Sequence, residues 1–205
     1  MKILLTLLMS ILLIAVSTAF ALKDIPNGLT VTRFIGKGIG ELRFRIHTSK
    51  EGEITGIDRI EILGKTQTVQ TIDLDYGDPP CDHCELLEFA DLNFDGYLDL
   101  LVLTGFGTGG KSYDVWLFNK KTIAFQKSND LSQLQNYSIN IQEKEIESSS
   151  PRGASEGSKY YYKVNNGKIG MYKEVSYEVT ADGKTRTITK LKSKGQWQKV
   201  SETLE

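Results

Sequence analysis

The chain has 205 residues, enough for one domain or two small ones, and 40% of them are hydrophobic. Its 25 basic and 26 acidic side chains nearly balance, so charge gives no reason to expect nucleic acid or an anionic membrane as the partner. With 2 histidines, one of them between cysteines, the sequence offers no credible nucleophile–base set, and we do not expect an enzyme.

The first residues have the pattern of a secretory signal peptide. Lys2 supplies a basic start, Ile3–Val16 is mostly apolar, and Ala19-Phe20-Ala21 is a small-x-small cleavage site. The alternative is a membrane anchor, because an apolar segment of this length nearly spans a bilayer, but the cleavage site argues against it. We therefore predict a signal peptide over residues 1–21, a single domain over 22–205, and a periplasmic or secreted protein.

The mature chain begins with strand patterns. Apolar and polar residues alternate in Leu29–Thr32 and in Glu41–His47, which is typical of strands with one buried face. Ile57–Leu63 and Gln67–Leu74 are expected to form a second strand pair around Gly64-Lys65.

An acidic, proline-bearing loop then carries both cysteines, Cys81 and Cys84. In an exported protein the expected state of such a pair is a disulfide. Cys-x-His-Cys also resembles the motif of periplasmic thiol oxidants, but that chemistry needs the first cysteine at a helix N-terminus in a thioredoxin-like unit. Two prolines precede Cys81, so a structural disulfide is favoured over a redox pair.

The most specific motif is a calcium loop that starts at Asp91 and ends at Asp99. Calcium prefers six to eight oxygen ligands, and a chain folded around the ion presents alternate side chains to it. Gly96 permits the sharp bend. The expected ligands are the side chains of the first, third, fifth and ninth loop residues and the carbonyl of the seventh: Asp91, Asn93, Asp95, Asp99 and Tyr97.

The loop differs from an EF-hand at its twelfth position, where Val102 replaces the usual bidentate glutamate. Leu100–Leu103 has the pattern of a buried strand. We therefore expect a calcium loop between strands, as in FG-GAP repeats. The remaining ligands would be water or one of the nearest acidic residues, namely Asp78, Glu85 and Glu88. The alternative is a polar turn without an ion.

Gly105–Ser112 matches the phosphate-binding pattern GxxxxGK[ST] and follows an apolar strand. A phosphate site also needs a helix that begins at the lysine. Tyr113–Phe118 is instead aromatic and β-branched, as in a strand. We predict a glycine-rich connection between two strands and no nucleotide.

The rest of the chain predicts mostly strands. Ile123–Phe125 would complete a hairpin, Leu131–Leu134 a brief helical turn, and Tyr137–Ile141 another strand. The polar segment Ser148–Ser158 is expected to be a flexible loop that is either idle or contacts a partner.

The C-terminal third has turn signals at Asn165–Gly167, Asp182-Gly183 and Lys194-Gly195, each between strand patterns. The sequence therefore predicts an all-β fold of antiparallel hairpins, in a sandwich or a β-propeller-like array.

Several features together resemble a family of periplasmic calcium-binding β-proteins. They are the signal peptide, the calcium loop with its flanks (Phe89–Leu100), the Gly105–Gly110 loop, Tyr113–Phe118, and the polar loop ahead of Tyr160. The resemblance covers roughly Leu86–Tyr172. Characterised members of that family are immunity proteins that inhibit peptidoglycan-hydrolase effectors delivered by antibacterial secretion systems.

The resemblance implies calcium as the ligand of the loop and a peptidoglycan hydrolase as the partner. Our candidates for partner contacts are one cation and three aromatic residues, Arg152, Tyr160, Tyr161 and Tyr162, although alternate tyrosines on a strand are usually core residues. The alternative function is an envelope structural or ligand-binding module whose calcium only stabilises the fold.

Overall fold

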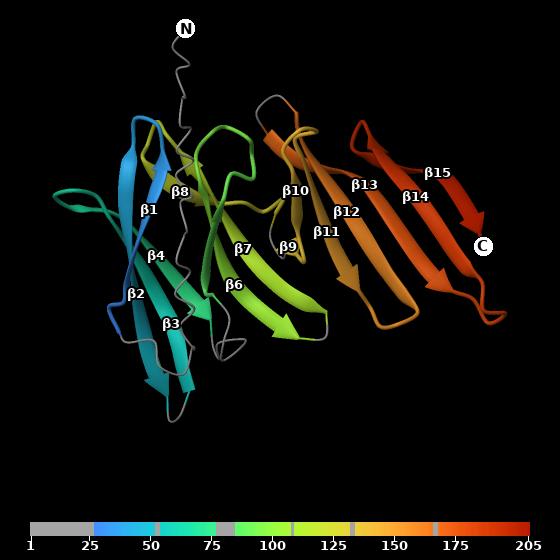
Figure 1. The fold of residues 1–205 in the computed structure, drawn as a ribbon, viewed down its shortest axis with the longest axis horizontal. Coiled ribbons are helices and arrows are strands. Elements are labelled where there is room, and N and C mark those ends of the chain that lie inside the picture. Colours follow the sequence, from blue (N-terminus) through green and yellow to red (C-terminus); the bar gives the residue numbers. More distant parts are fainter. Residues whose placement is uncertain (1–26, 52–53, 77–84, 108, 132–133, 166–167) are drawn as a thin grey trace, which may run out of the picture.

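The computed structural model describes residues 27–51, 54–76, 85–107, 109–131, 134–165 and 168–205. These residues form strands and turns without a helix, and the strands belong to three antiparallel sheets (Figure 1). The described part of the chain accordingly contains no helix that could cross a membrane. The predicted all-β fold of antiparallel hairpins is confirmed. Both cysteines and the whole expected signal peptide lie outside the described residues.

Sheet A is a four-stranded meander in the order β1-β2-β3-β4. Its strands are β1 (Thr30–Gly36), β2 (Gly40–Glu51), β3 (Ile54–Leu63) and β4 (Thr68–Tyr76). The expected alternation on β2 holds: Leu42, Phe44 and Ile46 are buried, and the arginines between them are exposed.

Sheet B follows in the order β5-β6-β7-β8, with a short strand β9 also paired to β7. Its strands are β5 (Leu87–Ala90), β6 (Asp99–Gly107), β7 (Gly110–Asn119), β8 (Ala124–Lys127) and β9 (Leu134–Gln135). The glycines of the phosphate-binding pattern end β6 and begin β7, and Lys111 is a strand residue. The predicted strand after the glycines is thus confirmed.

Sheet C is a six-stranded meander in the order β10-β11-β12-β13-β14-β15. Its strands are β10 (Ser138–Asn140), β11 (Glu145–Pro151), β12 (Glu156–Asn165), β13 (Lys168–Val179), β14 (Thr185–Ser193) and β15 (Gln196–Leu204). The expected flexible loop over Ser148–Ser158 is wrong, because most of it is paired in β11 and β12 and only residues 152–155 form a turn.

Sheet B is the middle layer of the protein, and each of its faces is covered by another sheet (Figure 1). On β6, Leu100 and Val102 pack with the interior of sheet A, including Phe44. Leu101 and Leu103 point the other way and pack with residues of sheet C, including Ile146. A strand that is covered on both faces needs apolar side chains at successive positions, because neither its odd nor its even residues face water.

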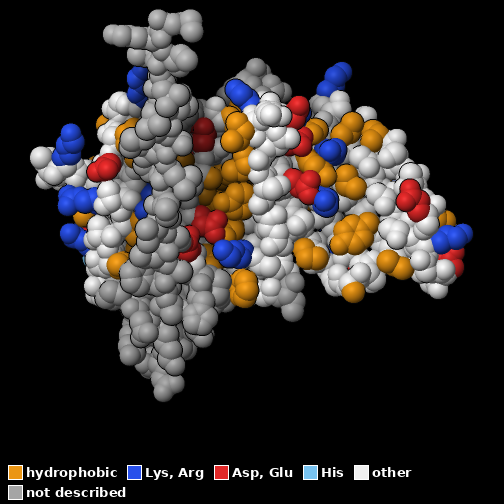
Figure 2. Space-filling model, viewed as in Figure 1, with side chains coloured by type: hydrophobic (Ala, Val, Ile, Leu, Met, Phe, Trp, Pro, Cys, Tyr) orange, Lys and Arg blue, Asp and Glu red, His pale blue; other side chains and the backbone are white. Residues whose placement is uncertain are grey.

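Sheet C extends beyond the cover that sheet B gives it. All positions of β15 are exposed, and β14 has no buried position. Hydrophobic side chains therefore reach the surface there, among them Leu191, Trp197, Val200 and Leu204; Figure 2 shows hydrophobic groups between charged ones on this part of the molecule. The last strands are held by their neighbours in the sheet rather than by a second layer.

The helical turn expected over Leu131–Leu134 has its two middle residues, 132 and 133, outside the described residues. The Leu134 amide donates to the Leu131 carbonyl at 3.3 Å, and Leu134 begins β9. Both leucines are fully buried in the core between sheets B and C.

Candidate functional site

The predicted calcium loop connects β5 to β6, and its bend lies where the sequence places it. Phe94 and Gly96 have left-handed backbone conformations, with φ of 58° and 85°. Glycine adopts this conformation without strain, whereas phenylalanine there was not anticipated. The Asp91 carboxylate closes the bend, because it accepts the amides of Asp95 (3.0 Å) and Gly96 (2.8 Å).

The third and fifth loop residues add to the same turn. Asn93 Oδ1 accepts the Asp95 amide at 3.1 Å, and its Nδ2 donates to Asp95 Oδ2 at 3.2 Å. Asp95 Oδ1 in turn accepts the Tyr97 amide at 3.0 Å. The oxygens of Asp91 and Asn93 thus lie against one amide, with the Asp95 carboxylate beside them.

Asp99 has a different environment from the other acidic residues of the loop. It is fully buried, and its two oxygens accept the amides of Leu92 and Phe118, each at 2.8 Å. Burial raises the pKa of Asp99 to about 7, against the two amide bonds, and the charges of Asp91 and Asp95 raise it further. Asp99 therefore links the start of the loop to β7.

These contacts test how well the loop fits calcium. Asp91, Asn93 and Asp95 gather three oxygen-bearing side chains on one turn, as a calcium loop requires. Asp99 is more deeply buried, but both of its oxygens accept backbone amides just as those of Asp91 do, and an oxygen with two lone pairs can accept an amide and bind an ion as well. Across the described residues, no three His, Cys, Asp or Glu side chains are grouped as metal ligands. Three of the four expected side-chain ligands thus lie on one turn, with Asp99 at its buried end, and calcium binding by this set stays a prediction.

The loop also fastens sheet B to sheet A. The Leu98 amide donates to the Ile35 carbonyl at 2.8 Å, and the Tyr97 hydroxyl donates to the Lys37 carbonyl at 3.3 Å. Gly36 lies directly against this contact: a Cβ added there would be 2.6 Å from the Tyr97 ring and 2.9 Å from the Gly96 carbonyl. Only glycine permits this approach, so the loop conformation and the seam between the two sheets depend on each other.

A second polar cluster, which the sequence did not predict, surrounds Glu88 on β5. Its carboxylate accepts hydrogen bonds from Lys111 Nζ (3.1 Å), the Tyr113 hydroxyl and the Tyr137 hydroxyl (3.0 Å). Burial raises the pKa of both phenols, and the Glu88 charge raises it further. The two rings also contact each other edge to face, with centroids 5.6 Å apart.

The Glu88 cluster joins segments that are far apart in the chain, since β5, β7 and the residue before β10 each contribute. Hollows of about 380 and 360 Å³ lie beside it, and Glu88 and Tyr137 line both. Each oxygen of the carboxylate has a partner within the protein. The cluster therefore braces these strands: Glu88, one of the acidic residues near the calcium loop, is bonded here to Lys111, the lysine of the glycine-rich pattern.

The four candidate partner residues do not share one face. Arg152 is exposed in the turn between β11 and β12. Tyr162 is 5% exposed and belongs to the core between sheets B and C, so its predicted partner contact is wrong. Tyr160 is half-buried against the same core. Tyr161 has the opposite parity and lies under Lys173, whose Nζ is 3.5 Å from the ring centroid.

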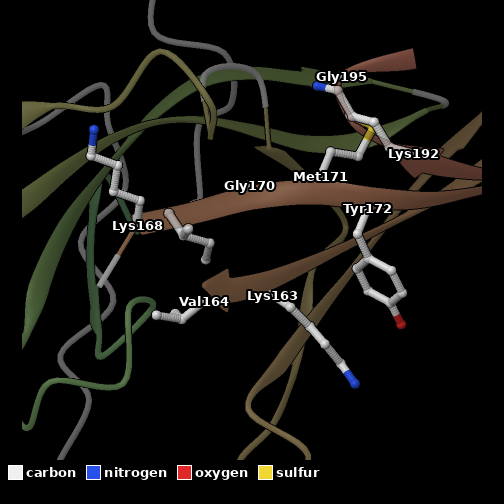
Figure 3. Close-up of a pocket in the computed structure, with 9 residues that line it drawn as sticks. Lys163, Val164, Lys168, Gly170, Met171, Tyr172, Lys192 and Gly195 are labelled. Carbon is white, nitrogen blue, oxygen red and sulfur yellow. The ribbon is translucent and has the colours of Figure 1, made fainter. Parts of the chain in front are cut away.

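A hollow of about 800 Å³ lies where β12 and β13 meet the β14–β15 turn. Figure 3 shows Lys163 and Tyr172 on one side of these strands and Met171 and Lys192 on the other. Lys163 also lies over the Tyr172 ring, 5.4 Å from its centroid. The hollow has basic and apolar walls but no cluster of converging polar groups.

Comparison with known proteins supports the fold. No protein-family description matches the chain, and no curated protein is significantly similar to it. A solved Xanthomonas type IV secretion system related protein is similar in structure: the TM-score is 0.62 and the identity 17%, over 89% of this chain and 98% of that chain. A Bacteroides fragilis protein of unknown function aligns over 79% of this chain and 91% of its own, but with a TM-score of 0.29 and 12% identity.

The first similarity shows a shared fold, and the second is too weak to support an argument. The chain is thus an all-β protein of three stacked antiparallel sheets, with the fold of the Xanthomonas protein.

Proposed function

We propose that the protein is an exported, immunity-type inhibitor that binds a peptidoglycan hydrolase and blocks its cleft. The observation that carries this proposal is Arg152, an exposed cation at the tip of the β11–β12 hairpin. Glycoside hydrolases that cleave glycan chains work with a pair of carboxylates. A guanidinium group matches a carboxylate in charge and in hydrogen-bond geometry.

The turn that presents Arg152 is firmly held. The Arg152 amide donates to the Glu156 carbonyl at 2.9 Å, and the Ser155 carbonyl accepts the Val179 amide at 2.7 Å. Behind the turn, β11 and β12 pair without interruption from Glu145 to Pro151. A turn fixed in this way loses little conformational freedom when it enters a cleft, which favours tight binding.

The fold and the N-terminal sequence give the proposal its setting. The protein of the same fold is described as related to a type IV secretion system. The signal-peptide pattern of residues 1–21 would bring this chain to the compartment where peptidoglycan is exposed. On β12, Tyr161 lies on the face away from the core and would extend the contact from the turn along the strand.

The calcium loop is the second part of the proposal. Asp91, Asn93, Asp95, Asp99 and the Tyr97 carbonyl would hold the ion, and Asp99 would also support the loop through its two backbone amide bonds. The ion would neutralise the neighbouring carboxylates and stabilise the turn that joins sheets A and B. Calcium thus serves the scaffold, and Arg152 contacts the hydrolase.

A screen tests the proposed function directly. The exported protein, purified in millimolar calcium, is added to muramidases and chitinase-type hydrolases, and the clearing of a peptidoglycan suspension is followed. We expect inhibition of at least one hydrolase at micromolar protein, with a 1:1 complex on size-exclusion chromatography. Absence of inhibition and of complex formation across the panel would overturn the proposal in favour of an envelope structural or ligand-binding module.

A further inference from the structure

The free edge of sheet C has properties that point to a second copy of the chain, independently of the proposed inhibitor function. β15 is the last strand of the sheet, and among the described strands it pairs with β14 alone (Figure 1). Three of its apolar side chains are well exposed: Trp197 by 40%, Val200 by 52% and Leu204 by 53%. An unpaired strand of nine residues is a template for another strand.

The hydrogen bonds to β14 show which backbone groups of β15 face outward. Thr185 and Glu205 exchange two backbone bonds, of 2.7 and 3.0 Å. In an antiparallel ladder the next residue points its N–H and C=O away from that partner. Leu204 therefore directs these groups to the free edge, and by the same alternation so does Glu202.

The other end of β15 is fixed by the turn at Lys194-Gly195. Both residues have positive φ, 49° and 82°, as in the type I′ turn of a two-residue hairpin. The flanking residues Ser193 and Gln196 pair with each other across it. Trp197, the next residue, consequently points its backbone groups outward, and so does Lys199.

A bulge between these two halves aligns their side chains. β14 pairs regularly up to Thr189, but Lys190 pairs with Lys199, so Val200 is the extra residue on β15. Trp197, Lys199, Glu202 and Leu204 lie opposite alternate residues of β14 and thus share one face of the sheet. The 2.8 Å contact between Lys199 Nζ and Glu202 agrees with this. Without the bulge, Lys199 and Glu202 would lie on opposite faces.

We propose that β15 pairs antiparallel with β15 of a second copy, about a two-fold axis between Val200 and Ser201. Trp197 then lies opposite Leu204 of the second copy, and Lys199 lies opposite its Glu202. The symmetry repeats both pairs. Apolar groups meet apolar groups, opposite charges meet, and all four residues direct backbone groups across the junction. The two six-stranded sheets become one continuous sheet.

Reciprocity is the reason to choose a second copy over an unrelated strand. A two-fold contact requires that each residue suit its own counterpart, so that if Lys199 meets Glu202, Glu202 also meets Lys199. β15 satisfies this for the charged pair and for the apolar pair in a single register. A lysine on an edge strand commonly prevents such pairing, but here Lys199 would form an ion pair with Glu202 of the second copy.

Sedimentation equilibrium of the exported protein tests the proposal, with circular dichroism to confirm that each variant is folded. We expect a monomer–dimer equilibrium within about 1–100 µM protein. Lys199→Glu places like charges opposite each other twice and is expected to weaken the dimer about tenfold or more. The matched control, Lys199→Glu with Glu202→Lys, restores opposite charges across the axis and is expected to restore the dimer.

Two results would overturn the proposal. One is a monomer for the unmodified protein over the whole concentration range. The other is a dimer whose affinity is the same in the single and the double charge variants, which would place the contact elsewhere on the surface. Both readouts are independent of hydrolase inhibition.

Discussion

The middle position of sheet B predicts that two adjacent leucines on β6, Leu100 and Leu101, are equally important for stability. Both are fully buried, but Leu100 packs toward sheet A and Leu101 toward sheet C. Truncation of a buried leucine to alanine removes its transfer free energy and leaves a cavity, at a cost of about 2–5 kcal/mol. Leu100→Ala and Leu101→Ala are each expected to lower the free energy of unfolding by that amount.

Urea unfolding followed by circular dichroism measures both variants, and the loss corresponds to a fall of about 4–20 °C in melting temperature. Ile141→Ala is the matched control, because Ile141 is 77% exposed, and we expect it to cost about 0.5 kcal/mol or less. In a two-layer sandwich, one of the two leucines would face water. A cost of about 1 kcal/mol or less for one leucine alone would therefore refute the three-layer arrangement.

Three further predictions concern the polar groups. Asp91→Asn is expected to abolish a calcium-induced rise in melting temperature. Asp99→Asn should also abolish this rise and, in addition, lower the free energy of unfolding by about 1–3 kcal/mol in chelator, because it leaves a buried amide unpaired; unchanged stability in chelator would contradict this. Glu88→Gln should lower the free energy of unfolding by about 1–3 kcal/mol, measured with urea, because it removes the ion pair with Lys111 and one hydrogen-bond acceptor. An unchanged free energy of unfolding would show that the Glu88 cluster does not stabilise the fold. Burial raises the pKa of Tyr162 to about 12, so the unfolded chain loses the phenol proton first, and the free energy of unfolding falls as pH rises above about 10. The urea midpoint of Tyr162→Phe should therefore fall less steeply with rising pH than that of the wild type. Parallel curves of midpoint against pH would contradict this.

Much of the fold follows from local patterns. Strict alternation predicts β2 with its buried face, and the apolar run Leu100–Leu103 predicts a strand without a solvent face. Asp182-Gly183 and Lys194-Gly195 mark hairpins because glycine supplies the positive φ that these turns need. Alternation and turn signals depend only on residues that are adjacent in the sequence, so they can be recognised without the structure.

Features that depend on distant partners are not visible in the same way. Ser148 and Ser158 made β11 and β12 resemble a flexible loop, yet both are buried, and Ser148 exchanges hydrogen bonds with the backbone of Gln135. Glu88 is close to the calcium loop in sequence, but its partners come from β7 and the start of the β10 segment. Only the fold brings those groups together.

The spacing of the calcium loop predicts its shape better than the role of each residue. The bend at Gly96 and the closing contacts of Asp91 are where the pattern places them. The same pattern names Asp99 as a ligand, but spacing alone does not reveal that both of its oxygens also accept buried backbone amides. Tyr162 is a similar case: a strand of consecutive tyrosines shows no parity until the opposing sheet is known.

The measurement that tests the central claim most directly is the residual activity of an inhibited hydrolase as the protein is titrated in calcium. We predict stoichiometric loss of activity with the unmodified protein. Arg152→Ala should weaken inhibition by about 2 kcal/mol or more, at least about thirtyfold. Arg43→Ala, which removes an exposed arginine from sheet A, should leave inhibition unchanged. Equal inhibition by both variants would contradict the account of Arg152, and no inhibition by the unmodified protein would contradict the proposed function itself.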